Sequence, residues 1–168
     1  MITLRPPGAA DQDFVLHLYA STRADLAELQ CDAAMRAQLI RMQCEAQQAH
    51  YRAHYPRAQA SLIIDSDGAP IGRLVVDRGP HEIRLVDISL LPQHRRRGIG
   101  QLLLRALMTE GEHAALPVRL SVLAGNPAIH LYQRLGFEGD GMMGAHHSMA
   151  WRGEAAMADS GHDSISLL

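Results

Sequence analysis

Cysteine is scarce in this chain: Cys31 and Cys44 are the only two cysteines among 168 residues. They lie in a polar, helix-like region, they are not spaced as CxxC, and they lack the electropositive surroundings that activate a thiol. The sequence therefore predicts two free thiols, a reducing compartment and a cytoplasmic protein.

Long hydrophobic runs are also missing. No apolar stretch approaches the roughly 20 residues of a membrane-spanning helix. The N-terminal stretch MITLRPPGAADQDF lacks the basic end and the apolar segment of a secretory signal. We therefore expect a protein that neither crosses a bilayer nor anchors in one.

An excess of positive charge is absent as well. The net charge is −2 at pH 7 with neutral histidines, so no global basic field would draw the chain to nucleic acid or acidic membranes. Hydrophobic residues make up 47% of the sequence, which is typical of an ordered globular protein. We expect one domain over residues 1–152 and a mobile tail over residues 153–168, which are small, polar and aperiodic.

Periodicity predicts a series of strands and helices. Strands are expected at ITLRP, ASLIID, PIGRLVVD, IRLVDISLLP and VRLSVL, with a last hairpin in FEGDGMMGAHHSMAWR. Helices are expected across AADQDFVLHLYASTR, from Asp32 to about His54, from near Gly98 to about Glu112, and across PAIHLYQRL. In the second helix the predicted core stripe is Met35, Leu39, Met42 and Ala46; in the third it is Leu102, Leu103, Ala106 and Leu107.

The segment LLPQHRRRGIGQLLL places Arg95, Arg96 and Arg97 directly before the third helix. A helix N-terminus presents unpaired backbone N–H groups and the positive end of the helix dipole. Gly98 and Gly100 leave room for a bulky ligand to approach this backbone, and the arginines add charge around it. The segment predicts a pyrophosphate site; the alternative is a solvated basic loop.

Other ligand motifs do not fit. Leu103 stands where a dinucleotide fingerprint has its third glycine, and no GK[ST] follows to make a Walker loop. His50 and His54 have metal-ligating spacing but lack an HExxH acid and a third ligand, so we expect a solvated helix face and no metal. Binding nucleic acid would need a broader basic surface than three arginines.

At these residues the chain resembles the GNAT superfamily of acyl-CoA N-acyltransferases. The family signature is Arg or Gln, two residues, Gly, one residue, then Gly or Ala, and Arg95, Gly98 and Gly100 match it. A second segment, NPAIHLYQRLGF at residues 126–137, is similar to the family's pattern of Asn, Leu-Tyr and Gly-Phe. The resemblance extends loosely from Thr3 to Arg152.

The resemblance implies an α/β (α+β) fold with a mixed, mostly antiparallel central sheet of about six to seven strands and helices on both faces. Strands 4 and 5, which end near Leu91 and Leu123, would be splayed, and acetyl-CoA would lie in the split. Leu90 would offer backbone groups to the pantetheine arm. Asn126 would touch the same region, or would serve only as a helix cap. The pyrophosphate would be held by Arg95, Arg96, Arg97, Gly98, Gly100 and Gln101.

Tyr132 is the residue that the resemblance assigns to the cofactor thiol, where it would assist the departing thiolate. Because a phenol with a pKa near 10 is a weaker acid than a thiol near 8.5, full proton transfer is uphill by about 2 kcal/mol in water. Tyr132 would then only hydrogen-bond the thiolate. The competing interpretation is an aromatic ring packed beside Leu131 and Phe137.

Asp87 is the candidate general base, because an acid is poorly suited to the apolar strand IRLVDISLL. Alternation places Asp87 and Ser89 on one face of that strand. The alternative is a structural acid satisfied by backbone groups or by an arginine. The remaining candidates for the base are Glu28, Glu82, one of His146 and His147, and ordered water.

These features predict an N-acetyltransferase in which a primary amine attacks acetyl-CoA directly in a ternary complex. The alternative is an acyl-CoA-binding sensor or interaction module of the same fold, and a nucleic-acid adaptor is a weaker third hypothesis. The acceptor, a small molecule or a peptide amine, is not specified by the sequence. Neither are the acyl-chain preference or the choice between a monomer and a homodimer.

Overall fold

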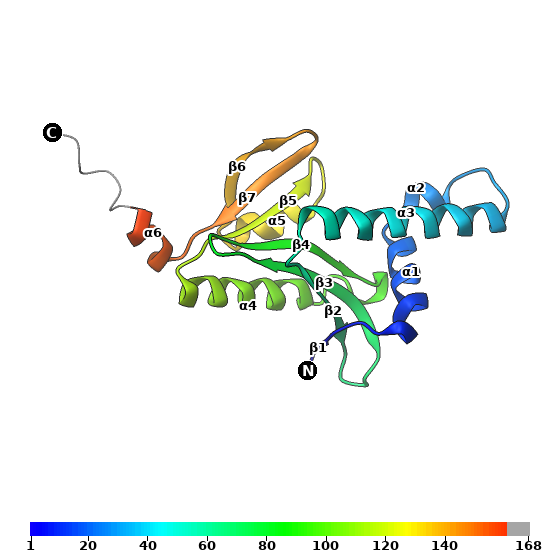
Figure 1. Ribbon diagram of the computed structural model, residues 1–168, viewed down its shortest axis with the longest axis horizontal. Helices are drawn as coiled ribbons and strands as arrows, with labels where there is room; N and C mark the ends of the chain where they lie inside the picture. The colour runs from blue at the N-terminus through cyan, green and yellow to red at the C-terminus, as the bar shows by residue number, and fades with distance from the viewer. Residues whose placement is uncertain (161–168) are drawn as a thin grey trace. The chain divides into compact units, whose positions relative to one another are not determined.

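The computed structural model describes residues 1–160. The strands are β1 Thr3–Arg5, β2 Gln59–Ile64, β3 Pro70–Arg78, β4 Ile83–Leu90, β5 Val118–Leu123, β6 Glu138–Met143 and β7 His146–Trp151. The helices are α1 Gln12–Ser21, α2 Ala24–Ala27, α3 Ala33–His54, α4 Ile99–Ala114, α5 Ala128–Arg134 and α6 Glu154–Ser160 (Figure 1). Short 3-10 turns cover Ala9–Asp11 and Pro92–His94.

The strands form one sheet of seven strands in the order β1-β2-β3-β4-β5-β7-β6. Antiparallel pairs join β1 to β2, β2 to β3, β5 to β7 and β6 to β7. β4 and β5 are parallel, and their register joins residues 83–85 to residues 118–120 only, although β4 continues to Leu90. The predicted mixed α/β fold, with its splay between strands 4 and 5, is confirmed.

The residues group into two compact units. The first comprises residues 1–77 and 86–97, and the second comprises residues 78–85 and the described residues from Gly98 onward. β4 passes from the second unit into the first at Val86. The single domain over residues 1–152 stays a prediction.

In the first unit, the hairpin between β2 and β3 forms as its turn residues predict. Gly68 adopts a φ of 82°, which glycine reaches without steric cost. The Asp65 carboxylate accepts hydrogen bonds of 2.9 Å from the N–H groups of Asp67 and Ala69. This turn fixes the register that places β3 beside β2.

The long helix α3 begins after Asp32, whose side chain accepts a 2.7 Å hydrogen bond from the N–H of Met35. The predicted helix is confirmed, but three of the four positions of the predicted core stripe are wrong: Met35 and Met42 are 54% and 56% exposed and Ala46 is exposed, whereas Leu39 is half-buried. Cys44 is the buried residue of this helix, and half-buried Ile40 and Tyr51 lie at helical spacing from it. Apolar residues stand on more than one face of α3, and the face that contacts α1 is the one that is covered (Figure 1).

In the second unit, α4 buries Leu103, Leu104 and Leu107. The predicted stripe was correct for Leu103 and Leu107 but wrong for Leu102, which is 56% exposed, and for Ala106. The covered face is therefore rotated by about one residue from the predicted one.

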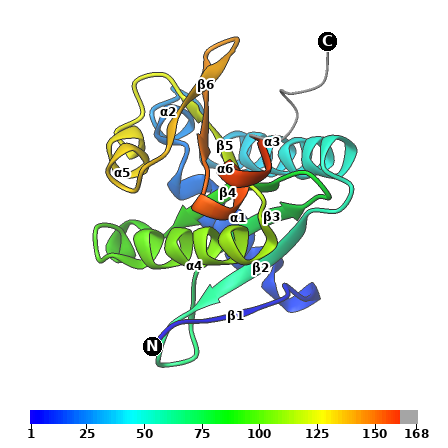
Figure 2. The same cartoon turned by 90° about the vertical axis from the view of Figure 1, so that its left-hand side faces the viewer.

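Residues 154–160, which the sequence analysis assigned to an aperiodic tail, form helix α6. The N–H of Ala155 donates a 3.1 Å hydrogen bond to the Glu112 carboxylate near the end of α4, and Ala156 is buried. Figure 2 shows α6, in red, beside α4. The rest of the predicted mobile tail, residues 161–168, lies outside the described residues.

Two further sequence predictions can be compared with the structure. Cys31 and Cys44 are both free cysteines, as expected. Within residues 1–160, no helix is both long and apolar enough to span a membrane.

Candidate active site

The arginine segment is a loop with two left-handed residues. After the 3-10 turn Pro92–His94, Arg96 has a φ of 59° and Gly98 a φ of 79°. Glycine tolerates this conformation, whereas Arg96 adopts it at a steric cost. Backbone strain at a loop that precedes a helix is typical of binding loops.

The N-terminus of α4 has no side-chain cap. Its cap residue is Gly98, and the bond from the N–H of Leu102 to the carbonyl of Gly98 is 2.9 Å long. In the described part of the chain, no acceptor is recorded for the N–H groups of Ile99, Gly100 and Gln101. A Cβ placed on Gly98 would meet nothing within 4 Å, so this helix end has open space in front of it. Such a helix end can accept an anion.

Arg95 makes contacts that the sequence did not predict. Its Nε donates a 2.8 Å hydrogen bond to the carbonyl of Leu90, and its Nη2 donates a 3.2 Å bond to the carbonyl of Ser21. The guanidinium therefore ties the loop to the end of β4 and to the end of α1. The Leu90 carbonyl, which was expected to face pantetheine, already accepts one of these bonds.

Arg96 and Arg97 differ from Arg95. All three side chains are exposed, but neither Arg96 nor Arg97 forms an ion pair or a side-chain hydrogen bond with another residue of the described chain. Their charges are therefore available to an exogenous anion.

Asp87 lies in an ion pair inside the first unit. Its Oδ2 is 3.0 Å from Nη2 of Arg73 and 3.4 Å from the hydroxyl of Ser89. The contact with Ser89 matches the predicted alternation along β4. The pairing with an arginine is the structural role that the sequence analysis left open, and Oδ1 of Asp87 has no recorded contact within residues 1–160.

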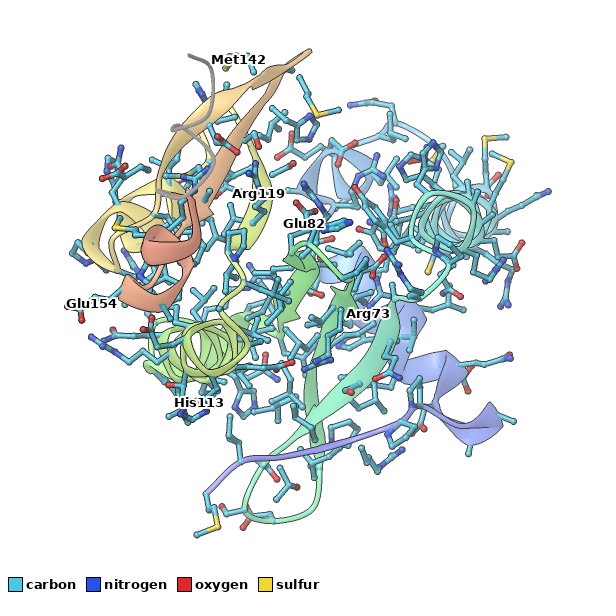
Figure 3. The ribbon with its side chains drawn as sticks, turned by 60° about the vertical axis from the view of Figure 1, so that its left-hand side comes forward. Arg73, Glu82, His113, Arg119, Met142 and Glu154 are labelled. Atoms are coloured by element: carbon cyan, nitrogen blue, oxygen red, sulfur yellow. The ribbon has the colours of Figure 1, made fainter. Side chains whose placement is uncertain are left out.

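Arg73 is a residue that the sequence analysis missed. Its side chain is only 9% exposed, and Nη2 also donates a 3.1 Å hydrogen bond to the Gln47 side chain of α3. Its guanidinium lies 5.9 Å from the centre of the Tyr51 ring. Arg73 is labelled in Figure 3 and lies on β3. Its contacts with Gln47 and Tyr51 show that its side chain packs against α3. The signal was a charged residue in the apolar run PIGRLVVD, the same signal that identified Asp87.

Tyr132 lies on α5 in the second unit. It is 8% exposed, and its ring centre is 5.9 Å from that of Phe137 at a tilt of 60°. α5 begins after Pro127, and the side-chain oxygen of the preceding Asn126 accepts a 2.9 Å hydrogen bond from the N–H of Ala128. Gly136, with a φ of 92°, lies just beyond the end of α5. The cap residue of α5 is Pro127, so the Asn126 side chain closes the turn that leads into the helix, and its amide nitrogen makes no recorded bond in the described chain.

The other candidate bases have varied surroundings. Glu82 is held by Arg84 at 2.7 Å and by Arg119 at 3.1 Å, and Figure 3 shows Glu82 and Arg119 side by side. Glu28 is exposed beyond the end of α2. His146 is exposed and His147 half-buried, which fits the expectation that neighbours in β7 face opposite sides. Two arginines already engage Glu82, which makes it the less available acid.

His50 and His54 are exposed on α3, as the sequence predicted. Their rings stack with centres 4.0 Å apart, and Nδ1 of His54 lies 3.0 Å from the carbonyl oxygen of His50. Within residues 1–160, no group of three or more His, Cys, Asp or Glu residues could hold a metal ion.

This arrangement can be compared with known proteins. It consists of the uncapped N-terminus of α4, the two arginines before it, and helix α5 with Tyr132. Residues 24–137, more than half of the chain, match the acetyltransferase (GNAT) family. The chain belongs to the GNAT family. No protein of curated function matches this GNAT chain.

Solved structures share the fold of this GNAT protein. A PaiA N-acetyltransferase from Thermoplasma acidophilum in complex with coenzyme A is 18% identical, with a TM-score of 0.66 over 91% of this chain and 99% of that chain. An acetyltransferase from Thermus thermophilus is 19% identical, with a TM-score of 0.62 over 90% and 97%. A spermidine N-acetyltransferase from Vibrio cholerae in complex with CoA and spermine is 20% identical, with a TM-score of 0.61 over 93% and 98%.

Proposed function

We propose that the chain is an N-acetyltransferase that moves the acetyl group of acetyl-CoA to a primary amine in a ternary complex. The amine nitrogen attacks the thioester carbon, the C–N bond forms and the C–S bond breaks. The products are an N-acetylated amine and free CoA, with one proton passing from the amine to a base and one reaching the departing sulfur. The observation that carries this proposal is the uncapped N-terminus of α4 behind Arg96 and Arg97, in a chain of the GNAT family.

The donor site follows from this helix end. The N–H groups of Gly100 and Gln101, with the charges of Arg96 and Arg97, suit the pyrophosphate of coenzyme A. Leu90 and Asn126 would meet the pantetheine arm through their backbone and side-chain amides. Arg95 would shape the loop through its bonds to Leu90 and Ser21. Two of the solved structures of this fold hold coenzyme A, which supports the choice of donor.

The proton transfers would involve Tyr132 and Asp87. Tyr132 would donate a hydrogen bond or a proton to the departing thiolate. Asp87 would take the proton of the attacking amine, directly or through water, using the Oδ1 atom that Arg73 does not occupy. An amine with a pKa near 10.4 is almost wholly protonated at neutral pH, so a base is required.

The acceptor is a small-molecule or peptide amine. The Vibrio cholerae structure contains spermine, which makes polyamines a reasonable first class to test on this chain. The alternative is an acyl-CoA sensor, which needs the donor site but has no chemical use for Tyr132, so the presence of Tyr132 favours the enzyme.

Two measurements test the proposal. First, acetyl-CoA at millimolar concentration should raise the melting temperature of the intact chain, and Arg97→Glu should abolish that rise. Arg105→Glu is a matched control, because Arg105 is an exposed arginine of α4 outside the loop. An unchanged melting temperature of the wild-type chain would overturn the assignment.

Second, a panel of amines should be incubated with acetyl-CoA and the acetylated products detected by mass spectrometry. Product detection is preferable to thiol release, because the free Cys31 and Cys44 would add background to a thiol assay. The chain contains no lysine, so its own side chains offer no lysine acceptor. Binding of acetyl-CoA without any product across the panel would support the sensor instead.

A further inference from the structure

The first unit contains a cavity of about 650 Å³ that is not lined by the residues proposed for acyl transfer. Its lining comes from the segment before α1, from α1 and α3, from the loop that joins α3 to β2, and from β2 and β3. Asp87, Leu90 and the residues of the arginine loop do not line it. Pockets of roughly 300–1,000 Å³ commonly hold small molecules.

The walls of this cavity combine apolar surface with hydroxyls. Val15 and Leu16 come from α1, Val75 comes from β3, Tyr51 comes from α3, and Tyr55 directly follows α3. Burial, together with the charge of Asp87, raises the pKa of the Tyr51 hydroxyl above its ordinary value, so this hydroxyl stays protonated and able to donate a hydrogen bond. The cavity therefore suits a ligand with an apolar body and an acceptor group.

The charges that line the cavity do not cancel. The Asp11 carboxylate is neutralised by Arg5 at 2.7 Å, which holds the pKa of Asp11 at about 2. Three charged lining residues of α3, Arg41, Glu45 and Arg52, form no ion pair within the described chain. Two positive charges thus face one negative charge, and the balance favours an anionic ligand.

Arg73 supplies the buried contact. It lines the cavity, its side chain is more than nine-tenths buried, and Nη2 is engaged by Asp87 and Gln47. Its Nε is also buried but has no hydrogen-bond partner among residues 1–160. A buried N–H without an acceptor is costly, and a carboxylate oxygen would satisfy it with a charge-assisted bond.

The geometry points to a second ligand site: this cavity binds a small organic carboxylate whose oxygen accepts a hydrogen bond from Nε of Arg73, with Arg41 and Arg52 balancing its charge. The apolar body of the ligand lies against Val15, Leu16 and Val75. Because Arg73 also pairs with Asp87, an occupied cavity acts on the residue proposed as the base, and this consequence alone rests on the proposed function.

Binding is tested on the full chain without acetyl-CoA by isothermal titration calorimetry. The probes are 4-phenylbutyrate and octanoate, with 4-phenylbutan-1-ol and 4-phenylbutylamine as controls of the same body without the carboxylate. We expect saturable one-to-one binding of at least one carboxylate, and at least tenfold weaker binding of both controls. Equal binding of carboxylate and alcohol, or no saturable binding of either carboxylate, overturns the proposal.

Variants locate the site. Ala60→Leu adds volume to the cavity wall, and the Arg41→Gln/Arg52→Gln pair removes charge at exposed positions of α3. Each should weaken carboxylate binding at least tenfold, whereas Arg105→Gln should leave it unchanged. If the Ala60 and arginine variants bind as tightly as the wild type, the cavity is not the site.

One further variant separates this proposal from the acyl-transfer proposal. Arg97→Glu, expected to lose acetyl-CoA, should keep the carboxylate affinity of the wild type. Loss of carboxylate binding in Arg97→Glu, or competition between the carboxylate and acetyl-CoA in the wild type, would assign the probe to the donor site and overturn a second site. A chain that binds the carboxylate but not acetyl-CoA would keep this inference while the proposed function fails.

Discussion

Nε of Arg95 donates a 2.8 Å hydrogen bond to the carbonyl of Leu90, the last residue of β4. A second bond, from Nη2 to the carbonyl of Ser21, ties the same guanidinium to the end of α1. The first arginine of the loop thus fixes the backbone from which the next two project. These two bonds give Arg95 a conformational role, and we propose that Arg96 and Arg97 bind the ligand.

Arg95→Ala should therefore act differently from Arg96→Ala. Loss of the two bonds at this exposed position should lower the free energy of unfolding by about 1 kcal/mol and speed hydrogen exchange at residues 96–98. Arg96→Ala should weaken acetyl-CoA binding with little effect on stability, because Arg96 has no recorded partner in the described chain. Equal denaturation midpoints for the two variants would contradict this division of roles.

Tyr132→Phe should lower kcat by about 10- to 100-fold while the Kd for acetyl-CoA changes little. The substitution keeps the ring that lies against Phe137 and removes only the hydroxyl proposed to act on the departing sulfur. Product formation under saturating substrate and calorimetric acetyl-CoA binding measure the two quantities. Tyr55→Phe is the matched control, because it removes a phenol hydroxyl from the residue that follows α3. An unchanged kcat in Tyr132→Phe would remove Tyr132 from catalysis.

Much of the fold was predictable from local pattern, because it is determined by short-range chemistry. Asp32 and Pro56 bound α3, Gly68 permits the β2–β3 turn, and the run Val118–Leu123 alternates as a strand should. The location of the arginine loop before α4 followed from the same kind of signal.

The remaining features depend on contacts between distant residues. The covered face of α3 was predicted wrongly because Met35 and Met42 are as apolar as Cys44, and packing against neighbouring elements, α1 and α2 among them, decides which face is buried. The position of β7 between β5 and β6 in the sheet cannot be predicted from the local sequence of these strands. The pairing of Asp87 with Arg73 could have been considered from the sequence, since Arg73, like Asp87, is a charged residue within an apolar strand.

Asp87→Asn should flatten the acidic limb of the kcat/KM profile if Asp87 accepts the amine proton, because the amide has no titrating carboxyl. The same change leaves the buried guanidinium of Arg73 without its carboxylate, so the free energy of unfolding should fall by about 3 kcal/mol. Rates must therefore be measured where circular dichroism shows the variant folded. A profile that keeps its acidic limb would shift attention to Glu28, His147 or ordered water.

The double variant Arg73→Gln/Asp87→Asn separates stability from catalysis. Removing both charges should cost less than the sum of the single variants by about 1–3 kcal/mol, because no unpaired charge remains. It should still lack the acidic limb. If the losses in unfolding free energy of the two single variants, measured by urea denaturation, add up to the loss of the double variant, the 3.0 Å contact between Arg73 and Asp87 contributes no coupling energy.

Gly72 lies in β3 beside the end of β4, and Gly72→Ala should displace the two strands from each other there. A Cβ at Gly72 would collide with the carbonyl oxygen of Ser89 and would lie 2.7 Å from the side chain of Leu90, closer than real Cβ atoms approach. β3 must then shift, at a cost of about 1–3 kcal/mol in the free energy of unfolding. Because Ser89 and Leu90 lie beside the Asp87 and Arg95 contacts, acetyl-CoA affinity should fall as well. Gly139→Ala is the control: its φ is not positive and a Cβ there meets nothing within 4 Å, so stability and affinity should stay at wild-type values. If Gly72→Ala melts like Gly139→Ala, the tight approach of β3 to the end of β4 does not exist in solution.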